Sequence, residues 1–268
     1  MHSREEKIEA FGRLLDTMDI LRQRCTWNAE QTMESIRPMT EEEVYELSDA
    51  VLRNDRNDVC KEIGDLLYHM VFYACIGEEE GSFDIADSLN KICDKMVFRH
   101  PHVFRPDGTL IPLGEAPSAK EIADTWELVK AKEKGGNKTV LGGIPDSMPA
   151  LLRALSMQEK ARGCGFDWEA PAQVWDKVRE EMGEAFEACT EGDRSHMEEE
   201  FGDLMFSVIN AARLYGIDPE AALSSTCNKF RRRFGYLESM TLKKGRNLKD
   251  MTLAEMDAIW DEGKSKGL

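Results

Sequence analysis

The sequence predicts an all-α fold made of two tandem helical-bundle domains that arose by internal duplication. Apolar residues recur at three- and four-residue spacing along most of the 268-residue chain, as they do on amphipathic helices. No convincing run shows the two-residue alternation of a β-strand. A pair of acidic motifs in the first half returns 138 residues later with the same internal spacing. A repeat of this length indicates a duplicated domain.

The first two helices of the chain are predicted from spacing and from a capping pattern. Apolar residues at helical spacing predict a helix over residues 4–24, and residues 25–28 are expected to break it. Thr40 is followed by Glu43 at the distance of a capping box, which predicts that the second helix starts there.

A third helix is expected to be central to the first half. Asp55 is its predicted N-cap, and the helix continues into an apolar run over residues 66–76. This helix is apolar on most sides, so it should be buried. Gly81 is expected to end this region, and residues 83–99 form the next predicted helix.

Residues 101–149 have a different composition and predict a connecting region. They contain six of the nine prolines, and glycine is frequent among them. One helix over about residues 118–134 is expected to interrupt the region. We therefore expect an N-terminal domain over residues 1–105, a connection over 106–146 and a C-terminal domain over 147–268. The predicted helices of the second half are 149–162, 171–190, 193–215, 219–240 and 252–264.

Charge and cysteine content limit the classes of partner and compartment. The net charge of −16 disfavours nucleic acid or an anionic membrane as a general partner. The seven cysteines are scattered without a Cys-x-x-Cys pair, which disfavours a zinc site or a disulfide framework. The first ten residues lack an apolar signal segment, and the longest apolar run is too short to span a bilayer. These features predict a cytoplasmic protein.

Four acids in the second half predict a metal site. Glu181 and Glu184 are three residues apart, as are Glu200 and Asp203, so each pair occupies one face of a helix. Two such helices packed together would gather four carboxylates at one point. Four anions cannot share a site without a positive charge between them, and hard cations such as Mg²⁺ prefer oxygen ligands.

The first half carries the same set and predicts a second candidate metal site: Glu43, Glu46, Glu62 and Asp65. A lone acidic cluster is more often a solvated helix face than a ligand set. Here the spacing of the four acids is the same in both halves, although duplication alone would preserve part of this agreement. The later acids of each set also run directly into apolar helix, where an unpaired charge is costly to desolvate. We therefore favour a metal site.

A basic pair and a tryptophan follow each acidic set. Lys229 and Arg233 are four residues apart on a predicted helix and form a cationic face suited to phosphate oxygens, and Trp260 could stack on a base. A surface basic patch and a core tryptophan are the alternatives. Subtracting 134 gives the second candidate nucleotide contacts: Lys95, Arg99 and Trp126. Metal, carboxylates and cations together suggest attack of water on phosphorus. The chain has no P-loop motif.

The acidic motifs resemble the signature of the all-α nucleoside triphosphate pyrophosphohydrolases, and the tandem arrangement resembles their MazG-like branch. Further matches span nearly the whole chain: Cys25–Thr32, Gly64–Leu67, His100–Phe104 and Gly165–Trp168. The resemblance implies Mg²⁺-dependent hydrolysis of a nucleoside triphosphate between the α and β phosphates, giving a monophosphate and pyrophosphate. It also implies a homodimer, which the apolar helices predict independently.

The resemblance also implies roles for individual residues. Glu181, Glu184, Glu200 and Asp203 would bind Mg²⁺. The implied nucleotide contacts are Lys177, Glu180, Glu181, His196, Glu199, Lys229, Arg233 and Trp260. His196 departs from the family pattern, which has a lysine there, so affinity or pH dependence is expected to differ. Glu180 and Glu199 are candidate catalytic bases by adjacency to the ligands alone.

We expect most catalysis in the second half, because its basic residues are more numerous. Lys177 and Arg179 precede its acids, whereas the first half has Met39 and Glu41 there. Lys61, where the second half has Glu199, partly offsets this difference. A nucleotide-sensing protein without turnover is the main alternative. A di-iron carboxylate bundle is disfavoured, because no histidine follows a glutamate by three residues.

Overall fold

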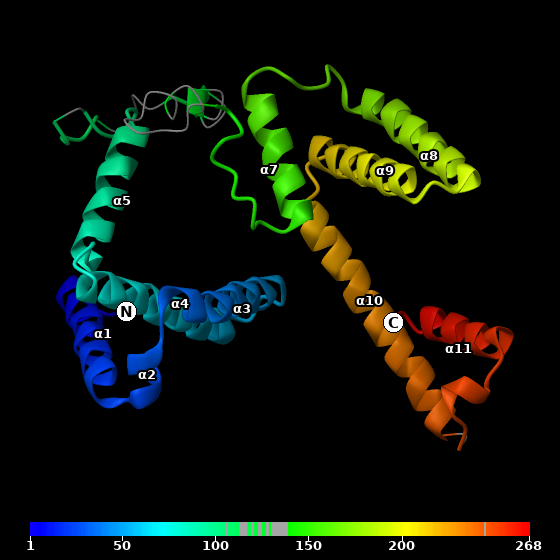
Figure 1. Ribbon diagram of the computed structural model, residues 1–268, viewed down its shortest axis with the longest axis horizontal. Helices are drawn as coiled ribbons and strands as arrows, with labels where there is room; N and C mark the ends of the chain where they lie inside the picture. The colour runs from blue at the N-terminus through cyan, green and yellow to red at the C-terminus, as the bar shows by residue number, and fades with distance from the viewer. Residues whose placement is uncertain are drawn as a thin grey trace. The chain divides into compact units, whose positions relative to one another are not determined.

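The structure, a computed structural model, confirms the all-α fold (Figure 1). It describes residues 1–105, 107–112, 117–118, 121–122, 125–126, 129, 139–243 and 245–268. Within this part of the chain the regular structure is helical, apart from one isolated bridge between Phe104 and Leu110. The chain divides into two compact units, Met1–Ala119 and Lys120–Leu268. The predicted helix over residues 118–134 lies largely outside the described residues, and the three-part domain division stays a prediction.

Unit 1 is built around α4, as the sequence predicted. Its helices are α1 (Arg4–Arg24), α2 (Thr26–Glu30), α3 (Met33–Leu52), α4 (Arg56–Glu79) and α5 (Ile85–Arg99). Helix α4 packs against α1, α3 and α5. Its side chains Val71, Phe72 and Ile76 are buried together with Met18 of α1 and Ile36 of α3. This cluster is the hydrophobic core of the unit.

Two predicted boundaries of unit 1 are wrong. Helix α3 begins at Met33 because Thr32 and Ser35 cap its first turn reciprocally. Thr40 therefore lies inside α3, where its hydroxyl hydrogen-bonds to the Ile36 carbonyl and to the Tyr73 hydroxyl. The expected break over residues 25–28 is limited to Cys25, since α2 follows at once. The predicted cap of α4 is confirmed, because Asp55 accepts hydrogen bonds from the first backbone amides of that helix.

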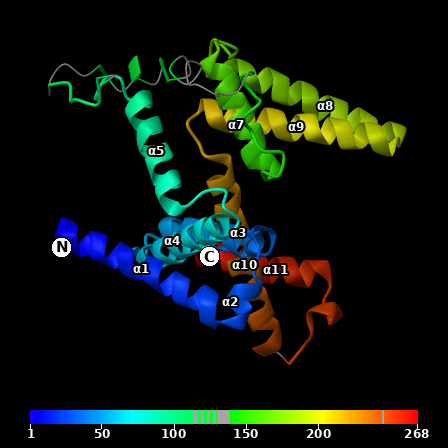
Figure 2. The ribbon, with the colours of Figure 1, turned by 60° about the vertical axis from the view of Figure 1, so that its left-hand side comes forward.

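Unit 2 contains the five helices that the sequence predicted, within a few residues at each end. They are α7 (Ala150–Gly163), α8 (Val174–Glu191), α9 (Arg194–Leu214), α10 (Pro219–Lys243) and α11 (Leu253–Ser265), with short 3₁₀ turns η1 (Pro171–Gln173) and η2 (Leu248–Asp250). Helices α8 and α9 lie side by side in both ribbon views, and α7 packs on α9 (Figure 2). Helix α11 folds back on α10.

The tight turns between paired helices position the acids. Helix α8 ends at Gly192, which adopts the left-handed conformation with φ 79°, and Asp193 then caps α9. In unit 1, Asn54 has φ 56° and Asp55 caps α4 after α3. Because both connections are short, each pair of helices is antiparallel, and acids near the turn on one helix face acids near the turn on the next.

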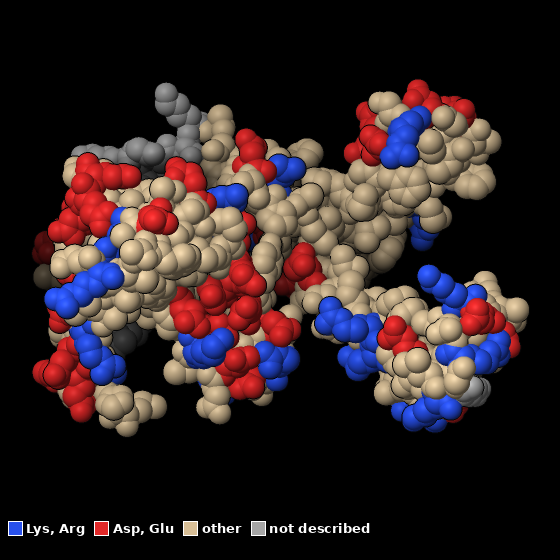
Figure 3. Space-filling view, turned by 60° about the horizontal axis from the view of Figure 1, so that its bottom comes forward, with Lys and Arg blue, Asp and Glu red and all other residues tan. Residues whose placement is uncertain are grey.

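The surface agrees with the acidic composition. Figure 3 shows Asp and Glu side chains gathered in dense patches, with Lys and Arg prominent at its lower right, over the end of α10 and α11. None of the helices in the described ranges combines the length and apolar character needed to cross a membrane.

Candidate active site

The α8–α9 pair brings three of the four predicted acids of the second half together. Glu181, Glu184 and Glu200 each offer a carboxylate oxygen within 4.8 Å of the others. Glu181 is only 5% exposed. Asp203 is outside this group of three, although it lines the same cavity as Glu181. Helical spacing of three residues and the short turn at Gly192 together produce this arrangement.

The α3–α4 pair gathers the equivalent acids in unit 1. Glu43, Glu62 and Asp65 each place an oxygen within 4.8 Å of the others, and Glu46 is outside the group. Glu62 is 2% exposed, and its Oε2 has no hydrogen-bond partner among the described residues. A buried carboxylate oxygen without a donor is costly unless a cation approaches it.

The electrostatics of both clusters favour a bound cation. Burial, together with the charges of Glu181 and Glu200, raises the pKa of Glu184. Burial and the nearby Asp65 raise the pKa of Glu43 in the same way. A divalent cation would remove this repulsion, and a set made only of carboxylates suits a hard ion such as Mg²⁺. The residues present therefore fit the expected metal.

Lys177 and Glu180 lie beside the acids of unit 2. The Lys177 ammonium is 2.7 Å from Glu181 Oε1 and 2.9 Å from Glu180 Oε1. Hydrogen bonds to these two carboxylates raise the pKa of Lys177, so it stays charged. Glu180 and Glu199 are exposed on their helices. Water can therefore reach both candidate bases.

His196 keeps more positive charge than a free imidazole would. Its Nδ1 is 3.1 Å from Glu191 Oε2, and its Nε2 is 3.2 Å from Glu200 Oε1. The hydrogen bond with Glu191, followed by the charges of both carboxylates, raises the pKa of His196. The histidine therefore places positive charge beside Glu191 and Glu200.

In unit 1, Lys61 lies beside the acids. The Lys61 ammonium is 2.8 Å from Glu62 Oε1, 3.8 Å from Asp65 and 3.9 Å from Glu46. The repeat places Glu199 at this position in the second half. Unit 1 therefore has a positively charged lysine, Lys61, beside its acids at the position where unit 2 has the acidic Glu199.

Two of the predicted nucleotide contacts of α10 and α11, Arg233 and Trp260, lie against each other. The Arg233 guanidinium lies 5.9 Å from the Trp260 ring centre and donates to the Leu268 carbonyl, and Phe230 packs 5.2 Å from Trp260. Lys229 is exposed, with no side-chain partner in the described residues. No hydrogen bond or ion pair of the described ranges connects Lys229, Arg233 or Trp260 to the acids.

The equivalents in the first half are divided between the units. Lys95 and Arg99 lie on α5 of unit 1, whereas Trp126 falls in unit 2. The repeat relates these three residues in sequence. The structure describes each unit by itself, so their joint role as nucleotide contacts stays a prediction.

A cavity of about 780 Å³ adjoins the acids of unit 2. Glu181, Asp203 and Lys177 line it together with apolar side chains of α7, α9 and the 165–168 loop. The sequence pattern alone does not predict this cavity. One feature of the sequence points to the cavity. The polar Gln158 lies four residues after Ala154, and therefore on the same face of α7, which is buried.

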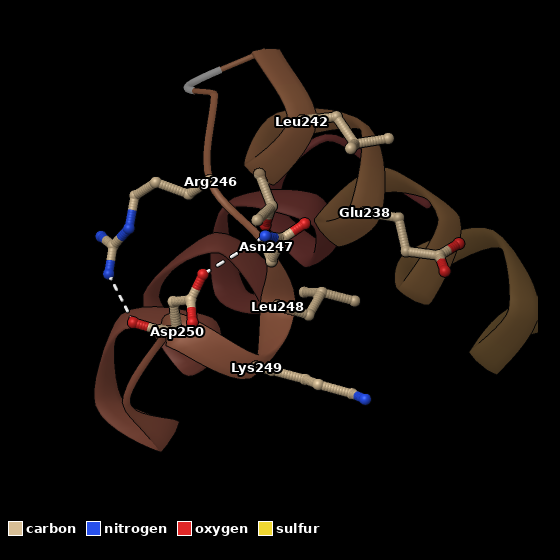
Figure 4. A pocket seen from close by; sticks show the side chains of 8 residues that line it. Glu238, Leu242, Arg246, Asn247, Leu248, Lys249 and Asp250 are labelled. Carbon is tan, nitrogen blue, oxygen red and sulfur yellow. Dashed lines mark hydrogen bonds between the residues drawn. The ribbon is translucent and has the colours of Figure 1, made fainter.

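A second cavity of about 690 Å³ is lined by the end of α10, by Arg246 and Asn247 of the following turn, and by η2 (Figure 4). Three of its polar residues, Arg246, Asn247 and Asp250, hydrogen-bond to one another. Arg246 donates to Glu255 at 2.8 Å and to the Asp250 carbonyl at 2.9 Å. The Arg246 guanidinium lowers the pKa of Glu255 to about 2. These contacts fix the turn between the helices, so we assign the cavity no ligand.

Both acid clusters fall within segments that match a known family. Residues 31–104 and 170–236 match the MazG nucleotide pyrophosphohydrolase domain. The chain belongs to this family. Among relatives of this MazG-family chain, a nucleoside triphosphate pyrophosphohydrolase of Escherichia coli (strain K12) is 39% identical over 95% of this chain and 97% of that protein.

Other proteins are also similar in sequence to this chain. The nucleoside triphosphate pyrophosphohydrolase/pyrophosphatase MazG of Thermotoga maritima is 38% identical over 95% of both chains. The uncharacterized protein YabN of Bacillus subtilis is 40% identical over 90% of this chain and 48% of that protein. A crystal structure of a mazG-related protein from Thermotoga maritima gives a TM-score of 0.39 at 26% identity, over 45% of this chain and 99% of that one.

Proposed function

We propose that this chain hydrolyses nucleoside triphosphates between the α and β phosphates, giving a nucleoside monophosphate and pyrophosphate, with Mg²⁺ as cofactor. The observation that carries the proposal is the acid cluster of α8 and α9. Three carboxylates lie within 4.8 Å of one another beside Lys177, and Glu181 also lines a cavity of about 780 Å³. Family membership and the names of the relatives support the same reaction.

The residues divide into three roles in this proposal. Glu181, Glu184, Glu200 and Asp203 would hold Mg²⁺, which would neutralise phosphate charge and polarise the bond under attack. Lys177 and His196 supply positive charge beside these acids, and Lys229, Arg233 and Trp260 are the further proposed nucleotide contacts. Glu180 and Glu199 are exposed carboxylates next to the ligands, so either can accept the proton of the attacking water.

We place the activity in unit 2. In unit 1 the Lys61 ammonium already lies within ion-pair distance of three acids. It competes there with any incoming cation, because both would be held by the same carboxylates. A structural, regulatory or weakly catalytic role for the first half follows.

Product analysis in ¹⁸O-labelled water tests the reaction. The full chain would be incubated with Mg²⁺ and each of the four common NTPs. We expect monophosphate and pyrophosphate, with the label in the monophosphate if water attacks the α phosphorus. Diphosphate with orthophosphate would overturn the proposal. Tight NTP binding without any product would instead favour the nucleotide-sensing alternative.

The proposal includes a homodimer and a cytoplasmic location. Helices α8 and α9 expose large apolar side chains, including Phe186 at 73%, Met205 at 60% and Met182 at 58%. Exposed apolar surface of this extent marks an interface. All seven cysteines are free, which suits a reducing compartment.

A further inference from the structure

The carboxylate of Glu200 is connected to the end of α8 through a single histidine. Glu191 is the last residue of α8, and His196 lies in the first turn of α9. His196 Nδ1 donates to Glu191 Oε2 at 3.1 Å, and its Nε2 lies 3.2 Å from Glu200 Oε1. The three side chains thus form a continuous polar chain across the turn at Gly192, and this chain ends on one acid of the cluster.

The two carboxylates occupy both ring nitrogens of His196. An imidazolium has two N–H donors and no acceptor, and each nitrogen of this ring faces a carboxylate oxygen. The family resemblance implies that His196 contacts the nucleotide, as a lysine does in the family pattern. Here the ring lies against Glu200, whose side chain is only 15% exposed. The contacts therefore favour a role of His196 that acts through Glu200.

A carboxylate that binds a metal needs a fixed orientation. Glu200 places an oxygen within 4.8 Å of oxygens of Glu181 and Glu184, and these are three of the four proposed Mg²⁺ ligands. An N–H donor on a ligating carboxylate restrains its rotation, and removal of such a donor typically weakens metal binding about 10- to 100-fold. A donor on Glu200 therefore bears directly on the affinity of the cluster for a metal.

We propose that Glu191 and His196 are positioning residues, in which Glu191 holds the imidazole ring and the ring holds Glu200 in the orientation that binds Mg²⁺. The inference rests on the proposed function, because that proposal assigns Glu200 to the metal. It adds Glu191, which belongs to neither acidic motif, to the residues that determine metal affinity. The expected signature is a change in metal affinity that is measurable without any nucleotide.

The first half supplies an internal comparison at the equivalent turn. Subtracting 138 from the three positions gives Arg53, Asp58 and Glu62. Arg53 Nη2 donates to Asp58 Oδ2 at 2.5 Å, so a polar bridge also crosses this turn, with the charges reversed. An ionised Asp58 only accepts hydrogen bonds, so it offers no donor to Glu62. Of the two turns, only that of unit 2 therefore directs a donor from this position to its acid.

Binding of Mn²⁺ without nucleotide, followed by electron paramagnetic resonance, tests the proposal. Every chain would carry Glu43→Gln with Asp65→Asn, which removes two of the three grouped acids of unit 1, so that the titration reports on unit 2. His196→Phe keeps a planar ring and removes both nitrogens, and we expect the Kd for Mn²⁺ to rise about tenfold. His196→Lys should recover most of the lost affinity, because an ammonium also donates to carboxylates.

Glu191→Gln tests the outer link and covers the case in which His196→Phe fails to fold. The Glu191 side chain is 64% exposed, so the substitution is compatible with folding. We expect the Kd for Mn²⁺ to rise about two- to fivefold, the range for a solvent-exposed ion pair. Glu187→Gln, at an exposed carboxylate one turn earlier on α8, removes the same charge and is the matched control, whose Kd should not change.

An unchanged Kd for Mn²⁺ in either variant that folds would overturn the proposal, as would equal weakening by Glu187→Gln. A rise in KM for the NTP with an unchanged Kd for Mn²⁺ would show that His196 contacts the nucleotide directly, which also overturns it. The reaction is judged separately. If the Kd rises as expected but the unaltered chain releases no pyrophosphate from NTPs, the proposed function fails and the positioning role stands.

Discussion

At the scale of single residues, the two acid clusters differ in the cation already beside them. Lys177 lies one turn before Glu180 and Glu181 on α8 and pairs with both, whereas Lys61 lies within ion-pair distance of two acids of the first cluster, Glu62 and Asp65, and of Glu46 beside it. Lys177 contacts one member of the second cluster, Glu181, whereas Glu184 and Glu200 have no lysine within ion-pair distance among the described residues. A lysine held by several ligands competes with the metal. The clusters should therefore respond differently to the same substitution.

Paired substitutions test this difference. Glu181→Gln with Glu184→Gln should lower pyrophosphate release at least about 100-fold, because the proposed metal ligands are lost. Glu43→Gln with Glu46→Gln should change the rate less than about threefold, since we place little activity in unit 1. Both double variants would first be checked for folding by circular dichroism. The opposite result, with only the first-half pair inactive, would show that our assignment is wrong.

A buried ion pair of unit 2 gives a prediction for stability and pH. The Arg213 side chain is 5% exposed and that of Asp167 is 20% exposed. The Arg213 guanidinium lowers the pKa of Asp167. Asp167→Asn should lower the free energy of unfolding by about 2 kcal/mol at pH 7, because it leaves a buried guanidinium with only the more distant Glu159 carboxylate, 3.9 Å away, as counter-charge.

The sign of the pH dependence follows from the lowered pKa of Asp167. The pair stabilises the fold fully above the unfolded pKa of about 3.9 and loses this effect as pH falls through the folded value. Denaturant unfolding at pH 7 and pH 3 should therefore show a smaller difference between the two chains at pH 3. Asp176→Asn, which removes an exposed ion pair with Arg179, is the control and should change stability by under about 0.5 kcal/mol at both values.

At the scale of helices, the site depends on the turn between α8 and α9. Gly192 has φ 79° and donates its backbone N–H to the Ala188 carbonyl, so the turn needs the left-handed conformation. Gly192→Ala should destabilise unit 2 by about 1 kcal/mol, because a Cβ is strained at positive φ. Thermal unfolding measures this change.

A helical glycine of the same unit is the matched control. Gly235 lies inside α10, and a Cβ there would meet nothing within 4 Å. Gly235→Ala should stabilise the fold by about 0.5–1 kcal/mol, because it favours the helix and restricts the unfolded chain. If both substitutions had the same sign, backbone conformation would not explain the role of Gly192.

At the scale of the whole molecule, the exposed apolar face of α8 and α9 predicts self-association. Light scattering at micromolar concentration should give twice the mass of the 30.4 kDa chain. Phe186→Glu, at a side chain that is 73% exposed, should shift the mass toward a monomer, since a charge is costly to bury in an apolar interface. Ile8→Glu, at an exposed position of α1, is the control. A monomeric mass for the unaltered chain would contradict the prediction.

The sequence by itself determined the helices, the duplication and the acid pairs. These features depend on local spacing: three residues place Glu181 beside Glu184 on any helix, and Asp55 caps α4 through its own next amides. The start of α3 was predicted wrongly because two competing capping patterns lie eight residues apart, at Thr32 and Thr40. Capping patterns in the local sequence do not decide at which of these two threonines the helix begins.

Only the tertiary structure decided which groups meet across helices. The Lys61 contacts, the Glu62 oxygen without a donor and the cavity around Gln158 join residues from different turns or different helices. The hydrogen bond from Gln158 to the Phe206 carbonyl spans 48 positions of the chain. Nothing in the spacing of the sequence fixes such a contact, because it depends on how the helices pack and on which polar atoms that packing leaves without a partner.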